Sequence, residues 1–209
     1  MDRESVNYFN KNNYIVVKDF ISEEMSSFLY NYVKLSSNRL NWAKQNIPDL
    51  NVKTFGQFPD LTGSYGSYGD ITFDTLLMHK LTVIEIMTGK KLLPTYSYFR
   101  LYIKGSELVK HIDRPSCEIS TTLCLGYDSD YNWPMFVEGK PIHLKPGDMI
   151  IYRGCELEHW REPFEGVNHA QVFLHYNEVD SKYSNLYDGR PILGLPDHSN
   201  PKNFKDFKY

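Results

Sequence analysis

Two histidines and one aspartate in the second half of the chain have the types and spacing of metal ligands. His111 and Asp113 are two positions apart, and His159 follows later in the chain. On a β-strand, residues i and i+2 point to the same face, so His111 and Asp113 would aim at one point. A second strand must then bring His159 to that point. Two imidazoles and one carboxylate can hold one face of a ferrous ion and leave its other positions open.

The length, composition and charge narrow the class of protein. A chain of 209 residues with 41% hydrophobic residues is long enough for one sizeable core. The 16 tyrosines raise the aromatic share to 15%, which favours half-buried strands and binding clefts. The net charge of −3 gives no broad basic surface, so we expect no nucleic-acid partner.

The sequence also indicates where the protein works. The N-terminus lacks a charged segment followed by an apolar run, and no apolar stretch reaches the roughly 18 residues of a membrane span. We therefore expect no signal peptide and no membrane partner. Cys117, Cys124 and Cys155 are odd in number and widely spaced, which indicates reduced thiols and a cytoplasmic location. Nothing in the sequence fixes the oligomeric state.

The N-terminal part reads as strand, helix, loop and helix. A strand is predicted at 14–17, and a helix follows Ser22, a good N-cap with two glutamates in the first turn. A second helix is predicted from about residue 74 to 87, ended by Gly89. Residues 44–72 lie between the helices, and their Gly/Ser/Tyr segment at 63–70 suits a surface loop. An active-site lid and a plain flexible loop are the two alternatives for it.

After Pro94 the sequence changes to short strands separated by turn residues. They are predicted at about 95–103, 108–114, 117–126, 134–137, 141–144, 148–152, 156–161 and 169–177. Such spacing predicts a mostly β protein, a jelly roll with the two helices packed on one sheet. We expect a single domain over 1–209, with N-terminal support to about 94, a core at about 95–177 and an irregular C-terminal extension at about 184–209.

Four short motifs follow one another along the second half of the chain, and their order is informative. They are R-x-Y-x-x-G at 100–105, H-x-D at 111–113, P-G-D at 146–148 and H-x-x-x-P at 159–163. Together they resemble the prolyl-4-hydroxylase-like branch of the iron(II)- and 2-oxoglutarate-dependent oxygenases. The resemblance covers about residues 95–177, with a looser likeness at 14–35. It implies a double-stranded β-helix, which is a jelly-roll fold, with His111, Asp113 and His159 binding Fe(II).

Other histidines compete for the third ligand position. His143, His169 and His175 are candidates, but His159 fits better because Pro163 falls four positions later, as in the family pattern. For His79 and His198 we expect surface or packing roles.

The likeness is incomplete at the cosubstrate anchor. In the family, a basic residue nine or ten positions after the second histidine grips the distal carboxylate of 2-oxoglutarate, whereas here the tenth position is His169. A protonated His169 can donate to a carboxylate, and Arg161 can help or substitute, although a surface ion pair explains Arg161 equally well. By position, Tyr102 and Thr122 are the other cosubstrate candidates, and a structural role for Tyr102 is about as well supported.

Four further residues are candidates for the substrate pocket. They are Arg100, Arg114, Cys124 and His175, the last of which stands where the family often has Trp. A plain core role suits Cys124 nearly as well. Arg114 either pairs with Glu118 or meets the substrate.

The resemblance implies a reaction. The protein would convert 2-oxoglutarate and dioxygen to succinate and carbon dioxide while hydroxylating an unactivated C–H bond, with ascorbate as a reactivating reductant. Asp113 favours hydroxylation, because related halogenases replace this carboxylate. The expected substrate is a prolyl residue in a peptide or protein, and a free amino acid or another small molecule is the alternative.

Two readings from other classes stay open. A non-catalytic jelly-roll binding module with a degenerate cosubstrate site is supported by the missing Lys or Arg anchor. A metal-dependent jelly-roll enzyme that uses no 2-oxoglutarate ranks last, because such sites usually hold three or four histidines.

Overall fold

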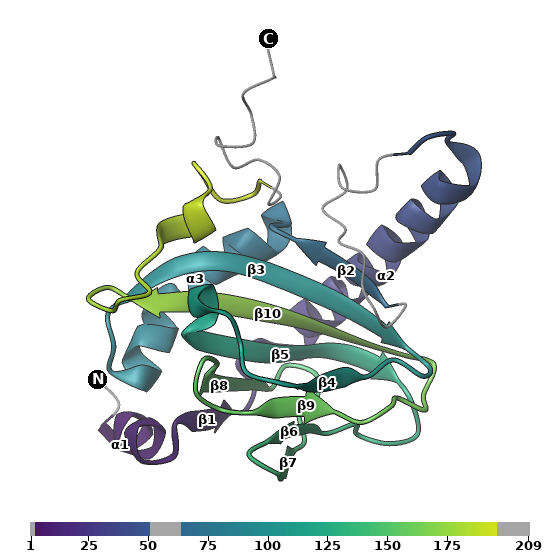
Figure 1. Ribbon diagram of the computed structural model, residues 1–209. Coiled ribbons are helices and arrows are strands. Elements are labelled where there is room, and N and C mark those ends of the chain that lie inside the picture. The colour runs from purple at the N-terminus through teal and green to yellow at the C-terminus, as the bar shows by residue number, and fades with distance from the viewer. Residues whose placement is uncertain (1–2, 51–63, 196–209) are drawn as a thin grey trace.

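Two antiparallel β-sheets form the body of the protein in a computed structural model that describes residues 3–50 and 64–195 (Figure 1). The major sheet has the strand order β1 (Tyr14–Val17), β8 (Met149–Arg153), β5 (Ile119–Asp128), β10 (Asn168–Glu178), β3 (Leu92–Ile103) and β2 (Tyr65–Tyr68). The minor sheet has the order β4 (Leu108–His111), β9 (His159–Arg161), β6 (Met135–Val137) and β7 (Lys140–Ile142). This arrangement confirms the predicted jelly roll.

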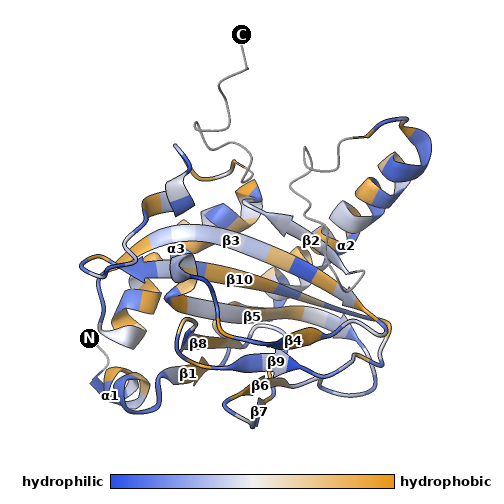
Figure 2. Ribbon diagram, viewed as in Figure 1, coloured by the Kyte–Doolittle hydropathy of each residue, from blue (hydrophilic) through white to orange (hydrophobic). Residues whose placement is uncertain are grey.

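Helices cover the face of the major sheet that is turned away from the minor sheet (Figure 1). α2 (Glu23–Asn46) packs on β3 and β5, and α3 (Ile71–Thr88) packs on β3 and β10. α1 (Arg3–Asn12) contacts α3 and β1. Hydrophobic and hydrophilic residues alternate along α2 and α3 (Figure 2), as expected for helices with one buried face. The main core therefore lies between these helices and the sheet, which leaves the opposite face of the sheet to the minor sheet.

The helix ends follow from local side-chain chemistry. The Ser22 hydroxyl accepts a hydrogen bond from the Met25 amide at 3.2 Å, and Gly89 ends α3 with a φ of 70°. Both features were predicted. α3 begins earlier than expected because Asp70 is its N-cap and accepts from the amides of Thr72 and Phe73 at 2.9 and 3.3 Å.

The structure differs from the expected pattern in the N-terminal half. α1 was not predicted from the sequence, and α2 continues to Asn46, through residues 44–46, which were predicted to belong to a loop. Residues 65–68 are neither a lid nor a flexible loop but the buried edge strand β2, which pairs with β3. Glycine is needed at Gly66 because a Cβ there would overlap the Tyr98 hydroxyl. Residues 51–63 of the expected loop lie outside the described residues.

The strands after Leu92 match the prediction closely, with two differences near the candidate ligands. The strand expected at 108–114 ends at His111, and the one expected at 156–161 is β9, which begins only at His159. Asp113 leaves the strand because its amide donates to the Gly154 carbonyl at 2.8 Å. Within the described residues, no helix is both long and apolar enough to cross a bilayer.

The Asp70 cap generates a stability prediction. Asp70→Ala should lower the free energy of unfolding by about 1–2 kcal/mol, because it leaves two amides of α3 without an acceptor. Asp70→Asn keeps an acceptor oxygen, so its free energy of unfolding should fall clearly less. Urea denaturation followed by circular dichroism measures both, and equal losses in the two variants would rule out the cap as the cause.

Candidate metal centre

The three candidate ligands meet between the two sheets. His111 at the end of β4 is paired in register with His159 at the start of β9, and Asp113 follows β4. The Asp113 Oδ1 atom lies 3.6 Å from His111 Nε2 and 3.5 Å from His159 Nε2. Because all three ligand atoms lie within 4.8 Å of one another, this set of two nitrogens and one oxygen fits a divalent metal ion.

Backbone carbonyl groups orient both imidazoles. His111 Nδ1 donates to the Val109 carbonyl at 2.6 Å, and His159 Nδ1 donates to the Leu157 carbonyl at 2.9 Å. With Nδ1 bonded to a backbone carbonyl, Nε2 is the ring nitrogen that faces Asp113 and is available to a metal. The site therefore has the outer hydrogen bonds that metal-binding histidines usually have.

The third ligand is held by its own contacts. Ser120 Oγ donates to Asp113 Oδ2 at 2.6 Å, and a Cβ on Gly154 would overlap that same oxygen. Burial by itself would raise the pKa of Asp113, but hydrogen bonds with His111 and His159 hold it well below its usual range. Asp113 is thus an ionised, fixed carboxylate.

A cavity of about 130 Å³ opens beside the triad. Alternate residues of β3 and β10 face into it as paired rows, Tyr96 opposite His175 and Tyr98 opposite Phe173. Arg161 and the triad belong to the same lining. The cavity therefore has a largely aromatic wall and a polar wall that carries the ligands.

Arg161 is a buried cation in the cavity wall. The residue is 2% exposed, its Nη1 donates to the Trp133 carbonyl at 2.8 Å, and its guanidinium lies 4.6 Å from the centre of the Trp133 ring. In the described part of the chain, no carboxylate forms an ion pair with Arg161, and its Nε has no hydrogen-bond partner. Burial lowers the pKa of Arg161, yet a guanidinium stays charged in proteins. Such a group fits an anionic ligand.

His169, expected at the anchor position, lies outside the cavity lining. It accepts from Gln171 Nε2 at 3.0 Å, lies 3.8 Å from Cys124 Sγ and stacks on Tyr127. Burial, followed by the charge of Arg161, lowers the pKa of His169 well below its ordinary value. His169 is therefore neutral, and Cys124 is one of its buried neighbours.

Tyr102 and Thr122 are both fully buried on the inner face of the major sheet. The Tyr102 hydroxyl has no hydrogen-bond partner among the described residues, and its ring packs edge-on against Trp133. Arg100 lines the cavity, with its guanidinium 5.5 Å from the ring centre of Tyr98 and 5.2 Å from that of Tyr102.

Of the two remaining pocket candidates, His175 lines the cavity and Arg114 does not. His175 lines the cavity and lies 3.0 Å from Ser120 Oγ, and burial lowers its pKa to about 4. Arg114 is not part of the lining and pairs with Asp188 rather than with Glu118.

Of the competing histidines, His175 lies beside Asp113, in a second possible ligand set with Cys117, whereas His143 lies apart from the triad, as does His79. His143 Nδ1 contacts the Asn132 carbonyl on an exposed segment, and His79 is exposed on α3. His198 lies outside the described residues.

Several residues around the site were not singled out from the sequence. Tyr96 and Tyr98 share strand parity with Arg100, and that alternation could have identified them. The contacts of Ser120, Gly154 and Asp188 bring together segments distant in sequence, and no local pattern marks them.

Comparisons with known proteins define the class of fold. No protein-family model matches the chain, and no curated protein matches it. Solved structures do match, and the fold is the one found in 2-oxoglutarate-dependent non-haem enzymes.

Three of these structures illustrate the likeness. A Pseudomonas putida prolyl-4-hydroxylase has 14% identity and a TM-score of 0.60, covering 85% of this chain and 99% of its own. HygX from Streptomyces hygroscopicus, solved with nickel and 2-oxoglutarate bound, has 9% identity and a TM-score of 0.62, covering 86% and 88%. The α-ketoglutarate-dependent carbocyclase SnoK from nogalamycin biosynthesis has 11% identity and a TM-score of 0.67, covering 94% and 93%.

The contact between Gly154 and Asp113 generates a prediction about metal binding. In Gly154→Ala, the added Cβ should displace the Asp113 carboxylate and weaken Mn²⁺ binding about 10-fold or more, the usual scale for disturbed outer contacts of a metal site. Isothermal titration calorimetry measures this affinity. Gly139→Ala is the control for general destabilisation, because its φ of 78° strains an alanine while open space surrounds its Cβ position. Equal Mn²⁺ affinities in both variants would contradict the prediction.

Proposed function

We infer that the protein is an Fe(II)- and 2-oxoglutarate-dependent dioxygenase that hydroxylates an unactivated C–H bond. One observation carries this proposal. The cavity that contains the oriented His111–Asp113–His159 set also contains the buried cation of Arg161, which has no carboxylate partner among the described residues. A metal site alone would suit many enzymes, whereas a metal site with a carboxylate anchor suits a 2-oxo diacid.

Each group in the cavity has a part in this proposal. His111, Asp113 and His159 would hold Fe(II), which with bound 2-oxoglutarate supplies the oxidising chemistry that transfers oxygen from dioxygen to a C–H bond. Arg161 binds the distal carboxylate of the cosubstrate, and Tyr102, which lies behind the cavity lining and packs on the same Trp133 ring as Arg161, is a second candidate donor. The neutral His169 does not compete for that carboxylate.

The aromatic wall suits the substrate side of the cavity. Tyr96, Tyr98 and Phe173 exclude water and offer flat surfaces to an apolar or cyclic group. We propose a prolyl residue of a peptide or protein as the first substrate to test, supported by the likeness to a prolyl-4-hydroxylase. Free amino acids and other small molecules form the second set.

The test of the reaction class is succinate formation. The purified protein, loaded anaerobically with Fe(II) and 2-oxoglutarate and then exposed to air, should release succinate even without substrate, at a slow uncoupled rate. Asp113→Ala removes one metal ligand and should abolish this release. Ascorbate should prolong turnover in the wild type. If the wild type forms no succinate and calorimetry detects no 2-oxoglutarate binding, the binding-module alternative replaces this proposal.

Arg161 generates a separate prediction. Arg161→Met removes the carboxylate anchor and should raise the KM for 2-oxoglutarate about 30-fold or more, because a charge-assisted hydrogen bond contributes roughly 2 kcal/mol or more. Arg161→Lys keeps the charge but not the planar guanidinium, so its KM should lie between those of the wild type and Arg161→Met. Succinate release at varied 2-oxoglutarate concentration gives the KM. A wild-type KM in Arg161→Met would assign the anchor elsewhere, with Arg100, the other cation of the cavity lining, as the next candidate.

A further inference from the structure

The segment after β10 returns to the metal-binding part of the chain. It contains a short 3-10 turn, η3 (Leu186–Gly189), which contacts β3. Tyr187 and Asp188 in this turn have φ values of 56° and 57°. L-residues adopt this left-handed conformation at a steric cost, so two in succession require compensating contacts.

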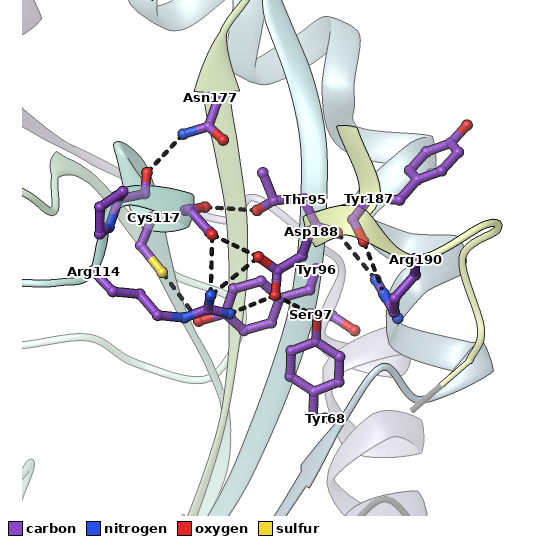
Figure 3. A network of polar contacts seen from close by, with 12 residues as sticks. Tyr68, Thr95, Tyr96, Ser97, Arg114, Cys117, Asn177, Tyr187, Asp188 and Arg190 are labelled. Atoms are coloured by element: carbon purple, nitrogen blue, oxygen red, sulfur yellow. Dashed lines mark hydrogen bonds and ion pairs between the residues drawn. The ribbon is translucent and has the colours of Figure 1, made fainter. Parts of the chain in front are cut away.

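The compensating contacts converge on the Asp188 carboxylate (Figure 3). Arg114 donates to both oxygens, at 3.0 and 2.6 Å, in a bidentate pair. Ser116 Oγ donates at 2.5 Å and Tyr68 Oη at 2.6 Å. The Asp188 side chain is only 6% exposed, whereas that of Arg114 is 49% exposed, so the carboxylate is shielded from water except on its Arg114 side.

Two of these donors belong to the segment that carries a metal ligand. Arg114 directly follows Asp113, and Ser116 lies in the turn η2 (Pro115–Cys117). Two more bonds fix this turn, from Thr95 Oγ1 to the Ser116 carbonyl and from Asn177 Nδ2 to the Pro115 carbonyl (Figure 3). Because Asp113 lies beyond the end of β4, the turn that follows it helps to set its position.

The Asp188 carboxylate is also linked, through Tyr68 and Arg114, to Tyr96 in the aromatic wall of the cavity. The Tyr68 ring stacks on Tyr96, with ring centres 4.6 Å apart, and the Arg114 guanidinium lies 4.5 Å from the centre of the Tyr96 ring. Tyr96 in turn contacts His175 inside the cavity. Asp188 therefore links the metal-binding segment with one wall of the cavity.

We propose that Asp188 is a positioning residue of the metal centre, which acts through Arg114 and Ser116 on Asp113 and through Tyr68 on Tyr96. The C-terminal segment is then part of the site. The proposal deepens the proposed function, on which its catalytic consequences rest, but metal binding tests it without any reaction.

A second attachment makes the proposal testable. Arg190 in the same segment pairs with Asp74 of α3 at 2.9 Å and donates to the Thr95 carbonyl at 3.0 Å. Both side chains of this ion pair are almost fully buried. Removing the Asp188 charge therefore leaves the segment attached through Arg190.

The experiment compares two Asp→Asn variants by Mn²⁺ titration. Asp188→Asn should weaken Mn²⁺ binding about 10-fold, the scale of outer contacts at metal sites. Asp148→Asn is the matched control: that buried carboxylate pairs with Lys18 and accepts backbone amides, but it does not line the cavity. It should lose thermal stability and keep wild-type Mn²⁺ affinity. Wild-type affinity in Asp188→Asn, or an equal loss in Asp148→Asn, would overturn the proposal.

A milder variant covers the case in which Asp188→Asn fails to fold. Arg114→Lys keeps one charged contact to Asp188 and should give an Mn²⁺ affinity between those of Asp188→Asn and the wild type. An unchanged affinity in a folded Arg114→Lys would count against the proposal.

The two proposals fail in different ways. If Asp188→Asn weakens Mn²⁺ binding but the wild type forms no succinate, the positioning role stands and the oxygenase function falls. If the wild type forms succinate and Asp188→Asn binds Mn²⁺ normally, the positioning role falls and the oxygenase function stands.

Discussion

The ionised carboxylate of Asp113, held between two imidazoles in the interior, is the constraint on which the rest of the site depends. A buried charge is costly unless hydrogen bonds and opposite charges compensate for it. Here the compensation comes from Ser120 on β5 and the imidazoles of β4 and β9, while the carbonyl of Gly154 fixes the backbone. Because these groups belong to both sheets, the site forms only when the sheets are packed together and their strands are paired in the observed register. A shift of one residue in β4 would turn His111 away from His159.

The sequence predicted the parts of this arrangement that have a local cause. Turn residues separate the strands after Pro94, and most of those strands occur where they were expected. The failures have tertiary causes. Gly66 belongs to a segment whose composition suits a loop, yet it is buried in a strand because the space of its missing side chain is filled by Tyr98. Asp113 was placed within a strand, but its amide bonds to Gly154, which no local pattern could indicate.

Residue spacing and the family pattern selected the proposed triad, whereas the sequence ranked His169 above Arg161, which is now the proposed anchor. Counting positions from His159 selects His169, but a count along the chain ignores charge. Two cations cannot lie close together in a buried site without a strong penalty, and Arg161 lowers the pKa of His169, adding to the larger effect of burial. A guanidinium keeps its proton far more firmly than an imidazole does, so Arg161 holds the charge and His169 becomes a neutral neighbour. The proposed assignment of the anchor thus depends on the effect of a charge on one strand on a residue of another strand.

The C-terminal segment shows how stability and site geometry can be separated within one stretch of chain. Arg190 attaches it to α3 and β3 through a fully buried ion pair, whereas Asp188 attaches it to the turn after Asp113. If the segment served only to cover the major sheet, the Arg190 contacts would be enough. The left-handed turn serves that attachment in part, because the Tyr187 carbonyl accepts from the Arg190 amide and Nε at 3.1 and 3.0 Å. The same turn also brings one carboxylate to Arg114, Ser116 and Tyr68 at once, which the Arg190 contacts do not require.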